Sequence, residues 1–142
     1  MADLEPLLRL GRWQVDEQRR HLGLLLASEE RLLAEQEALT RELAAEQAAA
    51  AEDALGAGLT YADYGAAVIA RREALDRALA AVRGEIDQAR EALADAYRQL
   101  KTYETVHAAR QRRAAEEAAR KEQAVLDEIG QTLHRRRQAA ED

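Results

Sequence analysis

The sequence contains no cysteine and no phenylalanine, and it has one proline, one methionine and one tryptophan. Without cysteine, a disulfide framework, a thiolate metal site and a thiol nucleophile are excluded. Aromatic residues make up 4% of the chain, and much of its 47% hydrophobic content is alanine. A globular enzyme core normally relies on large aliphatic and aromatic side chains. We therefore expect no compact enzyme fold and no cofactor.

Long apolar runs and an excess of positive charge are also missing. No 18 apolar residues follow one another, so we expect no membrane span, and the first residues do not resemble a signal peptide. The net charge of −6 and the pI near 5.2 argue against nucleic acid as the main partner. We expect a soluble, cytoplasmic protein.

What remains is the composition of long helices: 34% of the residues are charged, and Ala, Glu, Leu and Arg dominate. Proline is tolerated in a helix only in the first turn, so Pro6 places the start of the first helix near Asp3. Gly56 and Gly58 interrupt the helical pattern, and Thr60 with Asp63 resembles a helix start. We predict one coiled-coil domain over residues 1–142, with a helix over about 4–55, a turn at 56–60 and a helix over about 61–137.

Apolar residues recur in alternating steps of three and four in both predicted helices, which is the pattern of a coiled coil. In the first helix they are Leu4, Leu8, Val15, Leu22, Leu25, Leu32, Leu39 and Leu43. In the second they are Val68, Leu75, Leu79, Val82, Ile86, Ala89, Leu93, Ala96, Leu100 and Tyr103. The fold class that follows is all-α, a long two-helix antiparallel coiled-coil hairpin.

Folding the chain back near Leu59 pairs residues whose numbers add up to 118, so that Leu25 faces Leu93 and Gly11 faces His107. Residues beyond about 114 then have no partner and form an overhanging C-terminal helix. A new apolar stripe in this overhang contains Val125, Leu126, Ile129 and Leu133.

Two candidate binding surfaces lie at the open end of this predicted hairpin. Leu126, Ile129 and Leu133 have the spacing of a helix that docks into a groove, and Arg135, Arg136 and Arg137 follow them. Trp13 and Leu10 are expected on the outer face of the first helix, where tryptophan is a favoured interface anchor. The arginines can also serve only to stabilise a helix end, and Trp13 can lie along its own helix.

Residues with the spacing of a catalytic or metal site are absent. His21, His107 and His134 have no metal-ligand spacing. Tyr61 and Tyr64 are expected to pack across the bend onto Leu55 and Leu59.

The segments that carry a family resemblance are RLGRWQVDEQRR, YADYGAAVIARREAL, EALADAYRQLKTYE and LDEIG. Together they resemble the FliJ family, the general chaperone-like component of the bacterial flagellar type III export apparatus. The resemblance implies a stalk-like coiled coil whose open end enters the ring of the export ATPase. It also implies contacts with the cytoplasmic domain of the export gate and with export chaperones, at a peripheral position on the inner membrane.

We therefore predict a non-enzymatic export component that binds and stimulates the ATPase ring through the two candidate surfaces. One alternative is a structural coiled coil whose overhangs join two hairpins into a homodimer. Another is the equivalent stalk protein of a virulence type III secretion system. A rod that binds a membrane surface is a weaker alternative, because the chain is acidic and has no long basic face.

Overall fold

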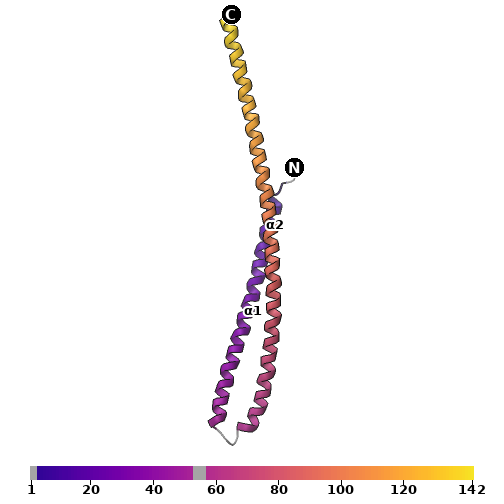
Figure 1. The fold of residues 1–142 in the computed structure, drawn as a ribbon, viewed down its shortest axis with the longest axis vertical. Helices are drawn as coiled ribbons and strands as arrows, with labels where there is room; N and C mark the ends of the chain where they lie inside the picture. The colour runs from indigo at the N-terminus through magenta and orange to yellow at the C-terminus, as the bar shows by residue number, and fades with distance from the viewer. Residues whose placement is uncertain (1–2, 53–56) are drawn as a thin grey trace. The chain divides into compact units, whose positions relative to one another are not determined.

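The computed structural model describes residues 3–52 and 57–142, with the side chains of 57–62 left out, and this part of the chain forms two long helices. Helix α1 spans Glu5–Glu52 and helix α2 spans Ala57–Glu141. The two helices pack against each other as a hairpin (Figure 1). The predicted all-α hairpin is therefore confirmed.

The start of α1 is fixed by a polar side chain and by a proline. The Asp3 carboxylate accepts a hydrogen bond from the Glu5 N–H at 3.1 Å, which satisfies one of the backbone donors that a helix start leaves unpaired. The first helical hydrogen bond runs from the Leu8 N–H to the Leu4 carbonyl at 2.9 Å. Pro6 lies in the first turn, where its missing N–H costs no helical hydrogen bond. The predicted start of this helix agrees with the structure to within one residue.

The start of α2 differs from the prediction. The helix begins at Ala57, so residues 57–60 are helical and do not form the predicted turn. Thr60 lies inside the helix and is not its N-cap. Gly58 is tolerated because it occupies the first turn, whereas the glycine penalty applies to helix interiors. Gly56 and the predicted end of the first helix at about residue 55 lie outside the described residues.

The chain divides into two compact units. Unit 1 contains Met1–Gly11 and Arg98–Asp142, and unit 2 contains Arg12–Tyr97. Both helices contribute to both units. The assignment of all 142 residues to one domain stays a prediction.

The core of unit 2 follows the predicted heptad positions. One cluster joins Leu25 to Ile86 and Ala89. A second joins Leu39 to Val68 and Leu75. Partly buried side chains extend these clusters: Leu22 and Val82 pack against the first, and Leu32, Leu43 and Tyr64 against the second. Burial of these side chains is the main force that holds the helices of unit 2 together.

Unit 1 has a short packed part and a long unpacked part. Leu4 and Leu8 are buried, and a β-carbon added to Gly11 would lie 3.1 Å from Cδ1 of Leu100. His107 Nε2 lies 3.5 Å from Glu5 Oε1, close to the start of α1. Every residue from 110 to 142 is exposed, although α2 continues to Glu141. Residues 110–141 are called the overhang below.

The register of unit 1 differs from the prediction by one heptad. Gly11 faces Leu100 and does not face His107, which instead approaches Glu5. The numbers of these facing residues add up to 111 and 112, not to 118.

The same correction applies in unit 2. Leu25 clusters with Ile86, so its predicted pairing with Leu93 is wrong. The side chains of Glu29 and Arg83 form an ion pair at 3.2 Å. The register is shifted in both units because α1 ends at Glu52 and α2 begins at Ala57, so the two helices are joined at an earlier point in the sequence than predicted. A shift of seven residues keeps every apolar residue on the same face.

Candidate functional site

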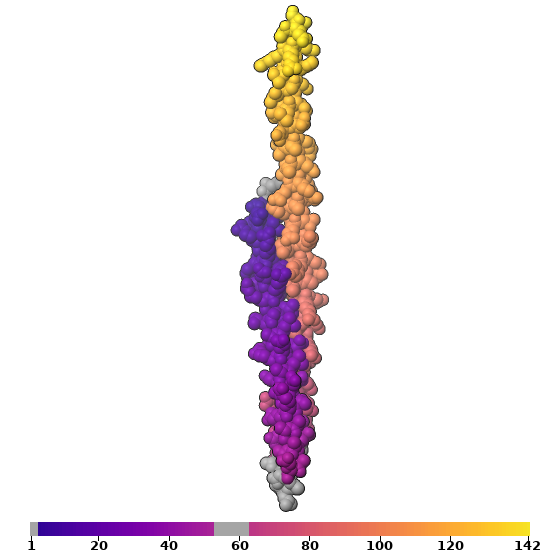
Figure 2. All heavy atoms as spheres, turned by 90° about the vertical axis from the view of Figure 1, so that its left-hand side faces the viewer, coloured from indigo at the N-terminus to yellow at the C-terminus, as the bar shows by residue number. Residues whose placement is uncertain are grey.

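The overhang exposes a row of large apolar side chains, as the sequence predicted. Val125, Leu126, Ile129 and Leu133 are between 52% and 58% exposed, whereas the packed Leu8 is 2% exposed. Leu126, Ile129 and Leu133 are three and four residues apart, so they lie on one face of the helix. These four side chains are called the overhang stripe. In Figure 2 the spheres of this segment, coloured orange to yellow, form a single narrow column.

Local interactions support the overhang as a helix. The Gln123 amide donates a hydrogen bond to the Asp127 carboxylate, four residues further along the helix, at 2.9 Å. Lys121 Nζ lies 3.7 Å from Glu117 Oε1. Exposed pairs at this spacing stabilise a helix by about 0.2–0.5 kcal/mol each. Because such pairs are weak, burial of the stripe against another surface would add substantially to the stability of this helix.

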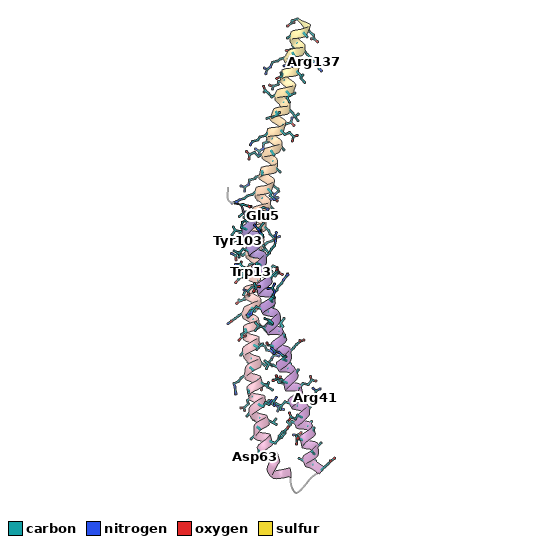
Figure 3. The ribbon with its side chains drawn as sticks, turned by 180° about the vertical axis from the view of Figure 1, so that it is seen from behind. Glu5, Trp13, Arg41, Asp63, Tyr103 and Arg137 are labelled. Carbon is teal, nitrogen blue, oxygen red and sulfur yellow. The ribbon has the colours of Figure 1, made fainter. Side chains whose placement is uncertain are left out.

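The three arginines follow the overhang stripe near the end of α2. Arg135, Arg136 and Arg137 are exposed and helical, and Figure 3 labels Arg137 close to the end of the helix. Consecutive residues on a helix point in different directions, so the three guanidinium groups do not form one compact site. Their position near the C-terminus of the helix is electrostatically favourable.

Leu10 is the second predicted anchor within unit 1. It is 47% exposed, and Leu7, one turn earlier on α1, is 37% exposed. On α2 of the same unit, Val106 is 40% exposed. The predicted outward position of Leu10 is therefore confirmed, whereas its contact with a partner stays a prediction.

Trp13 belongs to unit 2, and its exposed fraction of 58% is high for the chain's single tryptophan. Figure 3 shows it labelled on α1. The side chain therefore contributes little to the core of the hairpin. Tryptophan is enriched at the centres of protein interfaces, which keeps Trp13 a candidate anchor.

Tyr64 is a packing residue. It is partly buried and lies against the cluster of Leu39, Val68 and Leu75. The predicted packing partners Leu55 and Leu59, and the side chain of Tyr61, lie outside the described side chains.

Sequence reasoning missed an aromatic contact between the helices of unit 2. The guanidinium of Arg19 lies 5.2 Å from the centre of the Tyr97 ring, and an Arg19 N–H also donates a hydrogen bond to the Tyr97 hydroxyl. The numbers of these two residues add up to 116, so neither the predicted register nor the observed one places them directly opposite each other, and their long side chains span the offset.

Within the described residues, no group of His, Cys, Asp or Glu side chains could hold a metal ion. None of the described helices is long and apolar enough to cross a membrane. The fold and the exposed stripe define a class of protein: a helical hairpin whose longer helix presents an unpaired apolar face.

The family model described as "Flagellar FliJ protein" matches residues 1–139. The chain therefore belongs to the FliJ family, which confirms the resemblance seen in the sequence. The family is a non-catalytic component of the flagellar export apparatus. No curated protein and no solved structure matches the chain.

Proposed function

We propose that this protein acts as a stalk-like adaptor that docks the overhang against the ring of the export ATPase and stimulates its assembly and hydrolysis. The observation that supports this function most strongly is the overhang stripe, whose four large side chains are all more than half exposed. An apolar helix face of this kind fits a groove or pore lined by a protein partner. Contacts with the cytoplasmic domain of the export gate and with export chaperones, at the inner membrane, belong to the same proposal.

The proposed contact combines apolar anchors with positive charge. Leu126, Ile129 and Leu133 supply the main apolar contact, with Leu10 and Trp13 as further anchors. Arg135, Arg136 and Arg137 extend past the stripe and would face acidic surfaces of the ring. The charges would contribute to the rate and orientation of docking, while the apolar residues would supply most of the affinity.

The family match favours the flagellar system over a virulence type III system. We therefore infer that the cognate partner is the flagellar export ATPase.

The experiment adds the purified chain to its cognate export ATPase and measures hydrolysis and ring assembly. We expect the wild-type chain to raise both. We expect the triple variant Leu126→Ala, Ile129→Ala and Leu133→Ala to lose most of this effect, because alanine removes the anchors and preserves helix propensity.

Leu24→Ala is the matched control, since Leu24 is 70% exposed and lies outside the proposed surfaces. Wild-type stimulation by the triple variant, or no effect of the wild-type chain, would refute the proposed contact.

A further inference from the structure

The overhang stripe is the centre of a longer face of α2 that carries only two charged residues. An α-helix turns by 100° per residue, so residues separated by steps of one, three or four lie on the same side of it. Between residues 115 and 140, one such side consists of apolar residues and two charged ones. Its members are Ala115, Ala118, Glu122, Val125, Leu126, Ile129, Leu133, Arg136 and Ala140, all of them exposed. Glu122 precedes the stripe by about one turn, and Arg136 follows it by about one turn.

The positions of these two charges select one kind of partner. In a parallel pair of overhangs, Glu122 would face Glu122 and Arg136 would face Arg136, which is repulsive. In an antiparallel pair centred on Ile129, Glu122 of each chain lies beside Arg136 of the other. Val125 of each chain then faces Leu133 of the other and the two Ile129 side chains face each other, while Leu126 lies opposite Thr132. The face is complementary to a second copy of itself in the antiparallel arrangement only.

The overall charge and length of the overhang agree with this pairing. Between residues 115 and 140, five basic side chains balance five acidic ones, so two overhangs do not repel each other although the whole chain carries −6. Residue 142 of one chain would lie opposite residue 116 of the other. The start of α1 contacts α2 at His107, nine residues or about 13 Å away, and so does not obstruct the pairing.

We propose that the free protein associates as an antiparallel homodimer through this face of the overhang. The packed parts of unit 1, around His107 of each chain, then lie at opposite ends of the paired region. The interface is small because each chain contributes one helix face, so we expect a dissociation constant on the order of 10–100 μM. This association requires only the chain itself and does not rest on the proposed ATPase contact, although both use the overhang stripe.

Sedimentation equilibrium tests the proposal on the full chain at concentrations well below and well above the expected dissociation constant. The wild-type mass should rise from 15.8 kDa towards twice that value. The double variant Leu126→Ala and Ile129→Ala should remain a monomer throughout. Leu24→Ala, which removes an exposed leucine elsewhere, should behave as the wild type.

Charge reversal tests the orientation. Glu122→Arg alone and Arg136→Glu alone should each weaken the dimer, because each places like charges side by side. The double variant Glu122→Arg and Arg136→Glu should restore it, since the antiparallel pairs become attractive again. In a parallel dimer the double variant would still place like charges together.

Three results would overturn the proposal: a monomeric wild type at every concentration, a dimer that survives the loss of Leu126 and Ile129, or a double charge reversal that fails to restore association. Far-UV circular dichroism of each variant checks that its helices are retained. None of these measurements involves the ATPase, so failure here leaves the proposed function to its own test.

Discussion

A disulfide between Gly11→Cys and Leu100→Cys provides a direct test of how the helices of unit 1 are aligned. A β-carbon placed on Gly11 lies 3.6 Å from the β-carbon of Leu100. Disulfides join β-carbons that are about 3.5–4.5 Å apart. The substitution at Leu100 also removes Cδ1, the atom that lies 3.1 Å from the new β-carbon. We therefore expect the two thiols to oxidise to a disulfide within one chain.

The size of the effect follows from the length of chain that the bridge encloses. Residues 11 to 100 form a loop of about 90 residues, for which the chain-entropy estimate of stabilisation is ~4–5 kcal/mol. For a protein of this length, that corresponds to a rise in the melting temperature of about 10–20 °C. The natural sequence has no cysteine that could form a competing bridge. Non-reducing electrophoresis at low concentration and thermal unfolding with and without reductant measure both consequences.

The matched control is the pair Gly11→Cys and His107→Cys, which the alternative register would bring together. His107 is seven residues beyond Leu100, a displacement of about 10 Å along α2 that no disulfide can span. A bridge in the control pair and none in the first pair would refute the register derived from the structure.

Two further predictions concern the stability of unit 2. Leu25→Ala should lower the free energy of unfolding by ~2–5 kcal/mol, because Leu25 packs against Ile86, whereas the exposed Leu24→Ala should change it little; equal losses in urea unfolding would contradict the assigned faces. Gly84→Ala should raise the free energy of unfolding by ~0.5–1 kcal/mol, because its β-carbon would have no neighbour within 4 Å and alanine favours the helix; a loss of stability in the same assay would show an unrecognised contact at this position.

The heptad pattern was sufficient to predict which residues face inward. Leu8, Val15, Leu39, Leu75 and Ile86 are all at predicted core positions and all buried. The prediction succeeds because a helix face is defined by residue spacing alone, and that spacing does not depend on which residues of the other helix lie opposite. The same argument predicted the exposed overhang stripe, since its residues lie past the end of any possible partner in α1.

The register could not be predicted in the same way, because a heptad repeat looks the same after a shift of seven residues. Even the charges repeat: Glu29 pairs with Arg83, and the wrong register would have offered it Arg90. What distinguishes the two alignments is where the chain bends and how side chains fit locally, as at Gly11 beside Leu100. Neither is encoded in hydrophobic periodicity. The contact between Arg19 and Tyr97 follows from neither alignment, because it depends on the reach of two long side chains that do not lie directly opposite each other.

The two proposals assign the same side chains to two different partners, and this has a physical consequence. If the overhang stripe docks into the ATPase ring and also pairs with a second copy, the two associations exclude each other. Mass action then decides between them: a weak dimer with a dissociation constant on the order of 10–100 μM is mostly dissociated at low concentration. A tighter ring contact would displace it. The dimer would thus cover the apolar stripe where the protein is concentrated and leave it accessible where the ring is present, which limits nonspecific association of an exposed apolar helix face.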